Sequence, residues 1–159
     1  IQANRGTYND DDIRRLCINL VRSVGGISKR RTGGVYILPT AYADKIDALK
    51  NAIAEMVGNE ASIFTERIYD GATEKSNMAV SVYEDLQTRV ERIMIAVGAI
   101  GKQTCRLNAH KANIEELTQL TAMYRNILGE QDALTTLTTM LADAENKVAE
   151  QIQKVSVKA

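Results

Sequence analysis

One short polar turn holds the side chains with the clearest chemical potential in this sequence. It consists of Lys29, Arg30, Arg31, Thr32, Gly33 and Gly34. Three adjacent cations beside two glycines allow backbone amides and charged side chains to approach a phosphate together. Arg14 and Arg15, on a helix predicted just before the turn, extend the same basic surface. The competing interpretation, which we favour, is that cations at a hairpin tip are solvated and that glycines there serve the turn.

The other residues that can do chemistry are too sparse for a catalytic or metal site. His110 is the single histidine and has no Asp or Glu four residues away, so we expect a plain surface or core histidine. The run from Asp10 to Asp12 lacks the spaced oxygen ligands of a calcium loop and is explained as a helix start. Adjacent pairs such as Glu115 and Glu116 diverge around a helix, which does not suit paired-carboxylate catalysis. We therefore predict no enzymatic activity, no metal, no cofactor and no small-molecule substrate.

The two cysteines indicate the cellular compartment. Cys17 and Cys105 lie far apart, outside any CxxC or Cys/His cluster and among apolar helical residues. This usage favours buried free thiols and a reducing environment over one disulfide between the two cysteines. No uninterrupted apolar run approaches the roughly 20 residues that span a bilayer. We therefore expect a cytoplasmic protein without membrane partners.

Composition and charge limit the functional classes further. The 159 residues include 20 basic and 20 acidic side chains, and the formal net charge is zero. Residues 1–71 carry ten basic and nine acidic side chains, and residues 129–159 carry three and five. Bulk charge therefore predicts no strong affinity for nucleic acid or anionic membranes. With one Phe and no Trp, the core must consist mainly of aliphatic side chains and Met, which favours helix packing.

The second half of the chain is dominated by heptad stripes, which predict long helices packed on one another. The first stripe recurs in alternating steps of four and three, so its members share one side of a helix. It contains Ala79, Tyr83, Leu86, Val90, Ile93, Val97 and Ile100. Two further stripes follow, with a register slip between them. They contain Ile114, Leu117, Thr121, Tyr124 and Leu128, then Leu134, Leu137, Leu141, Ala144, Val148, Ile152 and Val155.

Two features of this region stay open in the sequence. The middle helix begins either at Asn113, which is spaced with Glu116 for a capping box, or already at Thr104. The register slip is either a tight turn, which makes a three-helix bundle, or a discontinuity in one long helix. We favour the turn because Gly129 suits a helix end and Asp132 a helix start.

Residues 1–71 predict a small α+β head in the order helix, strand, strand, helix, strand. Asn9, followed by three aspartates, starts the first helix, and Gly25-Gly26 ends it. A hairpin follows, and Thr40 caps the second helix. The stretch 61–69 predicts the third strand. The apolar stripe of the second helix contains Ala43, Ile46, Leu49, Ile53, Met56 and Val57.

The aromatic side chains of the head have two possible roles. They can fill the core, or they can form a stacking platform for single-stranded bases. We favour the core, because the head has no Trp to fill it. The four side chains are Tyr36, Tyr42, Phe64 and Tyr69.

One stretch resembles a known family. Residues 31–39 read Arg-Thr-Gly-Gly-Val-Tyr-Ile-Leu-Pro, with a helix before them and long helices after. This R-T-G-G-V-Y hairpin motif resembles an element of an uncharacterised family found on phages and related mobile elements. The match has specificity only over roughly residues 1–60. The resemblance implies a viral or mobile-element origin and supplies no activity and no catalytic residues.

We therefore predict an α+β head at residues 1–71 and an antiparallel helical bundle or coiled-coil hairpin at residues 72–159. The predicted function is a non-enzymatic interaction or assembly module that binds a protein partner, or itself, through its heptad stripes. A homo-oligomer is expected because the offset third helix needs a neighbour. The alternative is a nucleic-acid-binding protein that uses the first helix and the basic turn. A third hypothesis, an enzyme with a site shared between subunits, requires convergent carboxylates across a subunit boundary.

Overall fold

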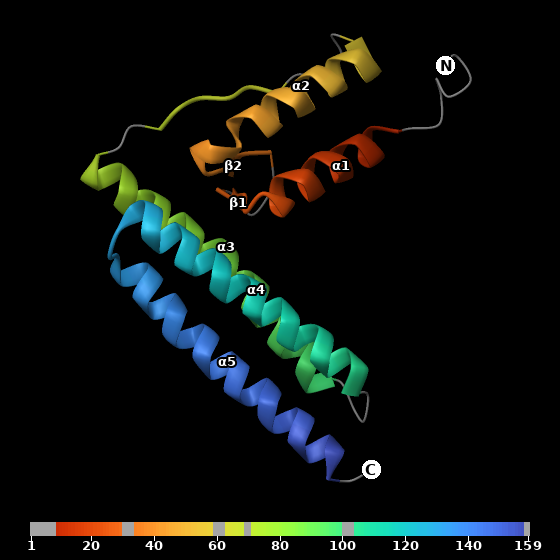
Figure 1. Ribbon diagram of the computed structural model, residues 1–159, viewed down its shortest axis with the longest axis vertical. Coiled ribbons are helices and arrows are strands. Elements are labelled where there is room, and N and C mark those ends of the chain that lie inside the picture. Colours follow the sequence, from red (N-terminus) through yellow and green to blue (C-terminus); the bar gives the residue numbers. More distant parts are fainter. Residues whose placement is uncertain (1–8, 30–33, 59–62, 69–70, 100–103, 158–159) are drawn as a thin grey trace.

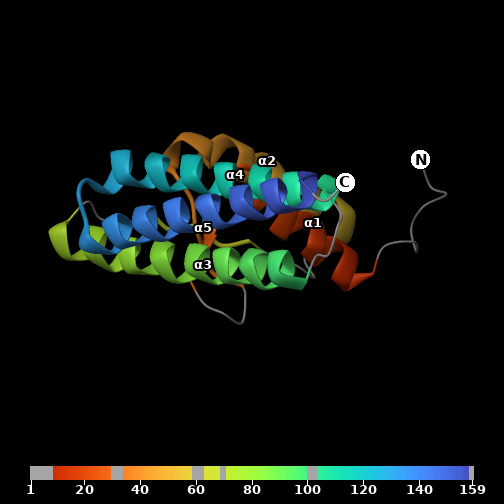
Figure 2. The same ribbon diagram turned by 90° about the horizontal axis from the view of Figure 1, so that it is seen from below.

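Three long helices form the larger part of the molecule. The computed structural model describes residues 9–29, 34–58, 63–68, 71–99 and 104–157. The long helices are α3 (Ala72–Ala99), α4 (Thr104–Leu128) and α5 (Asp132–Ser156). Consecutive helices run antiparallel and each one contacts the other two, which gives a three-helix bundle (Figure 1 and Figure 2).

The structure decides the two questions that the sequence left open, the nature of the register slip and the start of the middle helix. A tight turn joins α4 to α5, and Gly129 adopts φ +77° there, a conformation that glycine reaches without steric cost. The turn favoured from the sequence is thereby confirmed. Helix α4 begins at Thr104 and runs through Asn113, so a helix start at Asn113 is wrong.

The three heptad stripes meet in one core within a single chain. Leu86 and Val90 of α3, Ile114 of α4 and Leu134 and Leu137 of α5 are fully buried in it. Tyr83 and Ile93 pack against this core while partly exposed, and Ile100 lies outside the described residues. The core also buries Val97, Leu141, Ala144 and Val148. The outer face of α5 is polar, so its stripe finds its neighbours on α3 and α4 of the same chain.

The head is built from two helices around a short hairpin. Its elements are α1 (Asp10–Ser23), β1 (Ile27–Ser28), β2 (Tyr36–Ile37), the 3-10 turn η2 (Thr40–Tyr42) and α2 (Ala43–Val57). As predicted, Asn9 caps α1: its Oδ1 accepts from the Asp12 amide at 2.9 Å, and the Asp12 carboxylate accepts from the Asn9 amide at 3.3 Å. β1 and β2 are antiparallel, with Ile27 opposite Ile37.

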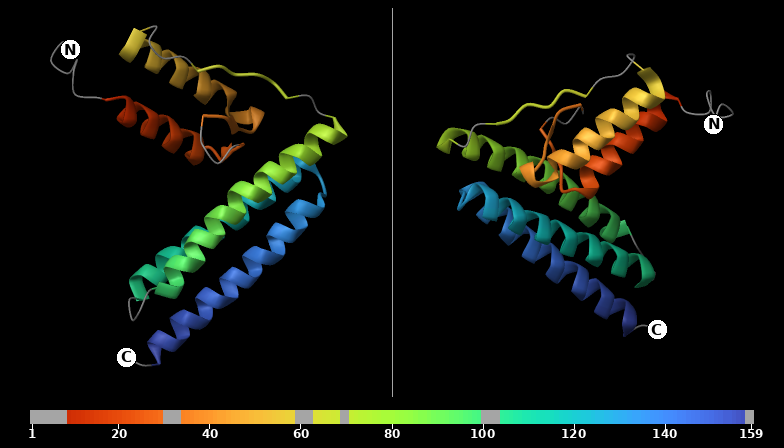
Figure 3. Two further views of the ribbon diagram at one scale, coloured as in Figure 1. Left: turned by 180° about the vertical axis from the view of Figure 1, so that it is seen from behind. Right: turned by 45° about the horizontal axis from the view of Figure 1, so that its top comes forward.

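Two expectations about the head are wrong. Residues 63–68 lie outside the sheet, which has two strands of two residues each among the described residues. Such short strands offer few ladder partners, and the chain instead runs back beside α2 to reach α3 (Figure 1 and Figure 3). Thr40 starts a 3-10 turn, and α2 has no side-chain cap.

The hairpin belongs to the bundle core, whereas the head helices lie outside that core. Ile27 and Ile37 join the buried cluster of α3, α4 and α5. Helices α1 and α2 lie side by side above one end of the bundle (Figure 1 and Figure 3). Five apolar residues in or next to these two helices are buried but do not belong to the bundle cluster. They are Val21, Val24, Ile46, Leu49 and Ile53. The hairpin therefore fixes the place of the head on the bundle.

Candidate functional site

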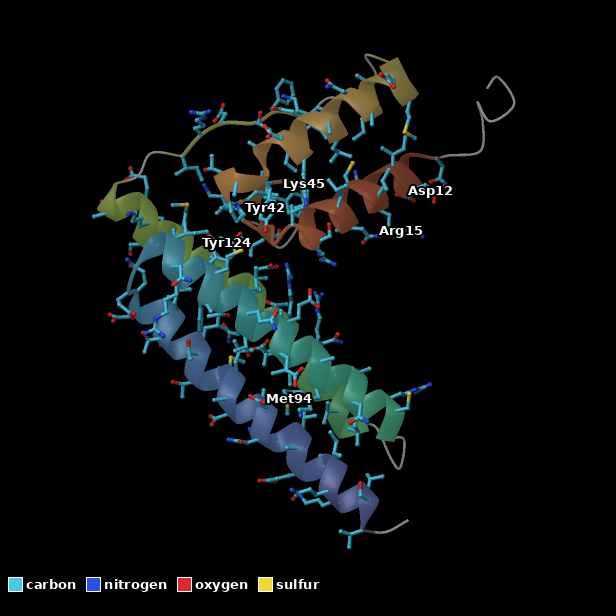
Figure 4. The ribbon with its side chains drawn as sticks, in the orientation of Figure 1. Asp12, Arg15, Tyr42, Lys45, Met94 and Tyr124 are labelled. Carbon is cyan, nitrogen blue, oxygen red and sulfur yellow. The ribbon has the colours of Figure 1, made fainter. Side chains whose placement is uncertain are left out.

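A buried tyrosine joins the head to the bundle. Tyr124 of α4 is 2% exposed and lies below the hairpin (Figure 4). Its hydroxyl is 2.8 Å from the Gly25 carbonyl oxygen and 3.2 Å from the Ile37 carbonyl oxygen. Burial raises the pKa of Tyr124 above its ordinary value, while the Arg89 guanidinium lowers it and the Asp85 carboxylate raises it. The hydroxyl therefore stays protonated and donates to the hairpin backbone at neutral pH.

An ion pair on α3 lies beside this tyrosine. One Nη of Arg89 is 2.5 Å from the Asp85 carboxylate, one helical turn away, and 3.4 Å from the Gly26 carbonyl oxygen. Both side chains are mostly buried, and the buried Nε of Arg89 has no hydrogen-bond partner among the described residues. Together with Tyr124, this pair holds the backbone that follows α1. The arrangement suits fixing the head, and it presents no nucleophile.

Two glycines allow close packing where the end of α1 leads into the hairpin. Gly25 adopts φ +78°, and a Cβ placed there would lie 2.8 Å from the Met123 Cε of α4. A Cβ at Gly26 would lie 2.6 Å from the Val21 carbonyl oxygen. Gly25 therefore allows α4 to approach the backbone carbonyls, and Gly26 allows the chain to turn back against the end of α1.

The candidate basic surface is solvent-exposed where the structure describes it. Arg14, Arg15 and Lys29 are exposed, and Arg15 projects from α1 on the side away from α2 (Figure 4). No ion pair joins these three cations to a carboxylate of the described residues. Gly34 is exposed with φ +87°. Arg30, Arg31, Thr32 and Gly33 lie outside the described residues.

The stretch before α3 exposes the largest apolar side chain of the head. Phe64 is 88% exposed and Ile68 is 48% exposed, so the expectation that Phe64 fills the head core is wrong. Tyr36 and Tyr42 are partly buried, and Tyr69 lies outside the described residues. Phe64 is exposed because residues 63–68 follow the outside of α2 rather than joining the sheet.

The cysteines and the histidine form no site. Cys17 is partly buried, and burial raises the pKa of its thiol. Cys105 is exposed in the first turn of α4, so its predicted burial is wrong. His110 is partly buried, and its Nδ1 has no hydrogen-bond partner among the described residues. Within the described ranges, no three His, Cys, Asp or Glu side chains gather so that they could hold a metal ion.

Sequence reasoning missed Tyr124 as the anchor of the head. The heptad stripe identified it only as a core residue, because Gly25 is 99 positions away along the chain. The sequence offers one weak signal for this role: a tyrosine stands within a stripe of aliphatic residues, and a buried hydroxyl needs a hydrogen-bond partner.

None of the described helices is long and apolar enough to cross a membrane.

Comparison with known proteins gives the family and no more. No curated protein and no solved structure matches the chain. A family model covers residues 1–157, which includes both the head and the bundle. The chain belongs to this family, a family of unknown function (DUF6744).

Proposed function

We propose that this protein is a non-enzymatic interaction module whose bundle supports a partner-binding head. One observation carries the proposal: the bundle closes its core within one chain, while Phe64 is 88% exposed. Exposing a phenylalanine costs the free energy that its burial would provide, about 1.5–3 kcal/mol. A bound partner that covers Phe64 and Ile68 would recover part of that free energy.

The heptad stripes have a supporting role in this proposal. Leu86, Leu141 and Val148 are covered by their own chain, so they can recruit a second chain only by exchanging a helix. Assembly by helix exchange remains our proposal for a homo-oligomer. Light scattering on the purified protein tests it, because an exchanged dimer doubles the mass.

The interaction proposal is tested by comparing variants as bait. The double variant Phe64→Ser/Ile68→Ser removes the apolar surface of residues 63–68, and Ile95→Ser is the matched control, since Ile95 is 74% exposed on α3. We expect a defined protein of the host lysate to bind the wild type and Ile95→Ser and to be lost from the double variant. Equal capture by all three would refute this surface.

Nucleic-acid binding by the first helix and the basic turn is the second candidate. It is favoured by the exposure of Arg14, Arg15 and Lys29 without carboxylate partners among the described residues. Each lost phosphate contact lowers the slope of log affinity against log salt by about 0.9. An Arg30→Ala/Arg31→Ala variant that bound DNA with unchanged strength and salt slope would refute it.

We propose a viral or mobile-element origin and an action in the host cytoplasm. The resemblance of residues 31–39 to an element of phage and mobile-element proteins supports the origin. The two free cysteines support a reducing compartment.

A further inference from the structure

We infer that residues 63–68 bind an extended strand of another protein, and that this strand carries a basic residue between two apolar ones. The inference rests on the proposed function, because it specifies how the partner would cover Phe64 and Ile68. It concerns the stretch Ile63-Phe64-Thr65-Glu66-Arg67-Ile68, which connects α2 to α3. Strand addition of this kind obtains affinity from the main chain and specificity from alternate side chains.

The backbone of this stretch is available for a partner strand. It runs as a stretched coil along α2 and is not part of the sheet (Figure 1). Among the described residues, no backbone hydrogen bond joins residues 63–68 to another segment. Backbone groups of the stretch that have no protein partner bind water, as at an unpaired sheet edge, and a second strand can replace that water.

The side chains of the stretch would divide between the two sides of a paired strand. Ile63 is partly buried, and the Thr65 hydroxyl is 3.4 Å from the Lys50 ammonium of α2, while residues 64–68 are all exposed. In an extended chain, alternate residues point to opposite sides. In a paired strand, Phe64, Glu66 and Ile68 therefore share one side, opposite Ile63 and Thr65. Their order there is apolar, acidic, apolar.

This order selects the kind of partner. Residues directly opposite each other on paired strands interact, and opposite charges favour pairing while like charges oppose it. A complementary strand therefore places apolar side chains against Phe64 and Ile68 and a Lys or Arg against Glu66. A second copy of the same stretch fits poorly, because the antiparallel register that pairs Phe64 with Ile68 also places Glu66 against Glu66.

The probes for this proposal are two disulfide-cyclised β-hairpin peptides. One outer strand reads Val-Thr-Lys-Thr-Val, and the other carries Glu in place of Lys. Each is titrated into the isotope-labelled full chain, and NMR follows both affinity and amide hydrogen exchange. We expect the Lys hairpin to bind about two- to fivefold more tightly than the Glu hairpin. We also expect exchange to slow at every second amide of residues 63–68, because only alternate amides face one neighbour.

Charge exchange provides the matched controls. Glu66→Lys should reverse the preference between the two hairpins, whereas Glu145→Lys on the exposed surface of α5 should leave it unchanged. Both substitutions lie on exposed positions, and circular dichroism verifies the fold. Identical affinities for the two hairpins, or a preference that Glu66→Lys does not change, would overturn the inference.

Failure of the binding mode and failure of the proposed function give different results. Hairpin binding that Phe64→Ser abolishes, without alternating protection of amides, would reject strand addition and retain the surface. No response of residues 63–68 to either hairpin would overturn strand addition, while the bait comparison independently decides the surface. A concentration-dependent dimer that Phe64→Ser abolishes would show that a second copy is the occupant and would also overturn the inference.

Discussion

Replacing Tyr124 by Phe tests whether one buried hydroxyl anchors the head to the bundle. The substitution keeps the aromatic ring in the core and removes only the group that contacts the Gly25 and Ile37 carbonyl oxygens at 2.8 and 3.2 Å. The hydroxyl has one proton, so it makes one good hydrogen bond to these two carbonyl oxygens. The substitution removes that hydrogen bond and leaves a buried carbonyl without its partner. Such a loss costs about 1–3 kcal/mol, because the carbonyl is left without a replacement for water.

Urea unfolding followed by circular dichroism measures this loss. We expect a lower midpoint with an unchanged slope, which corresponds to a smaller free energy of unfolding for the same exposed surface. Tyr83→Phe is the matched control: Tyr83 packs against the same core while partly exposed, and its hydroxyl has no hydrogen-bond partner among the described residues. The reasoning would be refuted if Tyr124→Phe and Tyr83→Phe changed the free energy of unfolding equally.

Four further predictions concern the joint, the end of α3 and the bundle core. Because the folded state raises the Tyr124 pKa above the unfolded value of about 10, its stabilisation is complete below about pH 10 and is lost above it; unfolding titrations should show a steeper alkaline loss for the wild type than for Tyr124→Phe. Gly26→Ala should destabilise by about 1–3 kcal/mol, since its Cβ would lie 2.6 Å from the Val21 carbonyl oxygen. Gly98→Ala should instead stabilise by about 0.5–1 kcal/mol, since nothing lies within 4 Å of its Cβ in α3, and a destabilising Gly98→Ala would contradict this. Leu137→Ala should cost about 2–5 kcal/mol by urea unfolding, because the side chain is 0% exposed.

The helices of the bundle could be predicted because their signal is local and repeated. Leu86, Val90 and Leu137 recur at heptad spacing, and a helix with such a stripe must cover it. The register slip and Gly129 together also predicted the turn before α5. The start of α4 at Thr104 was only one of two possibilities, since a capping box at Asn113 is also compatible with a helix interior.

The head was harder to predict because its elements are short and its contacts are distant. The β propensity of residues 61–69 suits a strand, but a strand also needs a neighbour with free backbone groups. β1 and β2 contain two residues each, and the hairpin packs into the bundle, so residues 63–68 follow α2 and expose Phe64. The exposure of Cys105 also depends on tertiary packing. Apolar residues near it in the sequence do not determine which side of the helix faces the core.

The sequence by itself determined the helix boundaries set by Asn9, Gly25 and Gly129 and most of the bundle core, because capping and heptad spacing act within a few residues. It also placed Arg14 and Arg15 on the first helix. Only the tertiary structure decided that the heptad stripes close within one chain and that Tyr124 binds the hairpin backbone. These contacts join residues up to 99 positions apart, and their geometry depends on how whole helices pack.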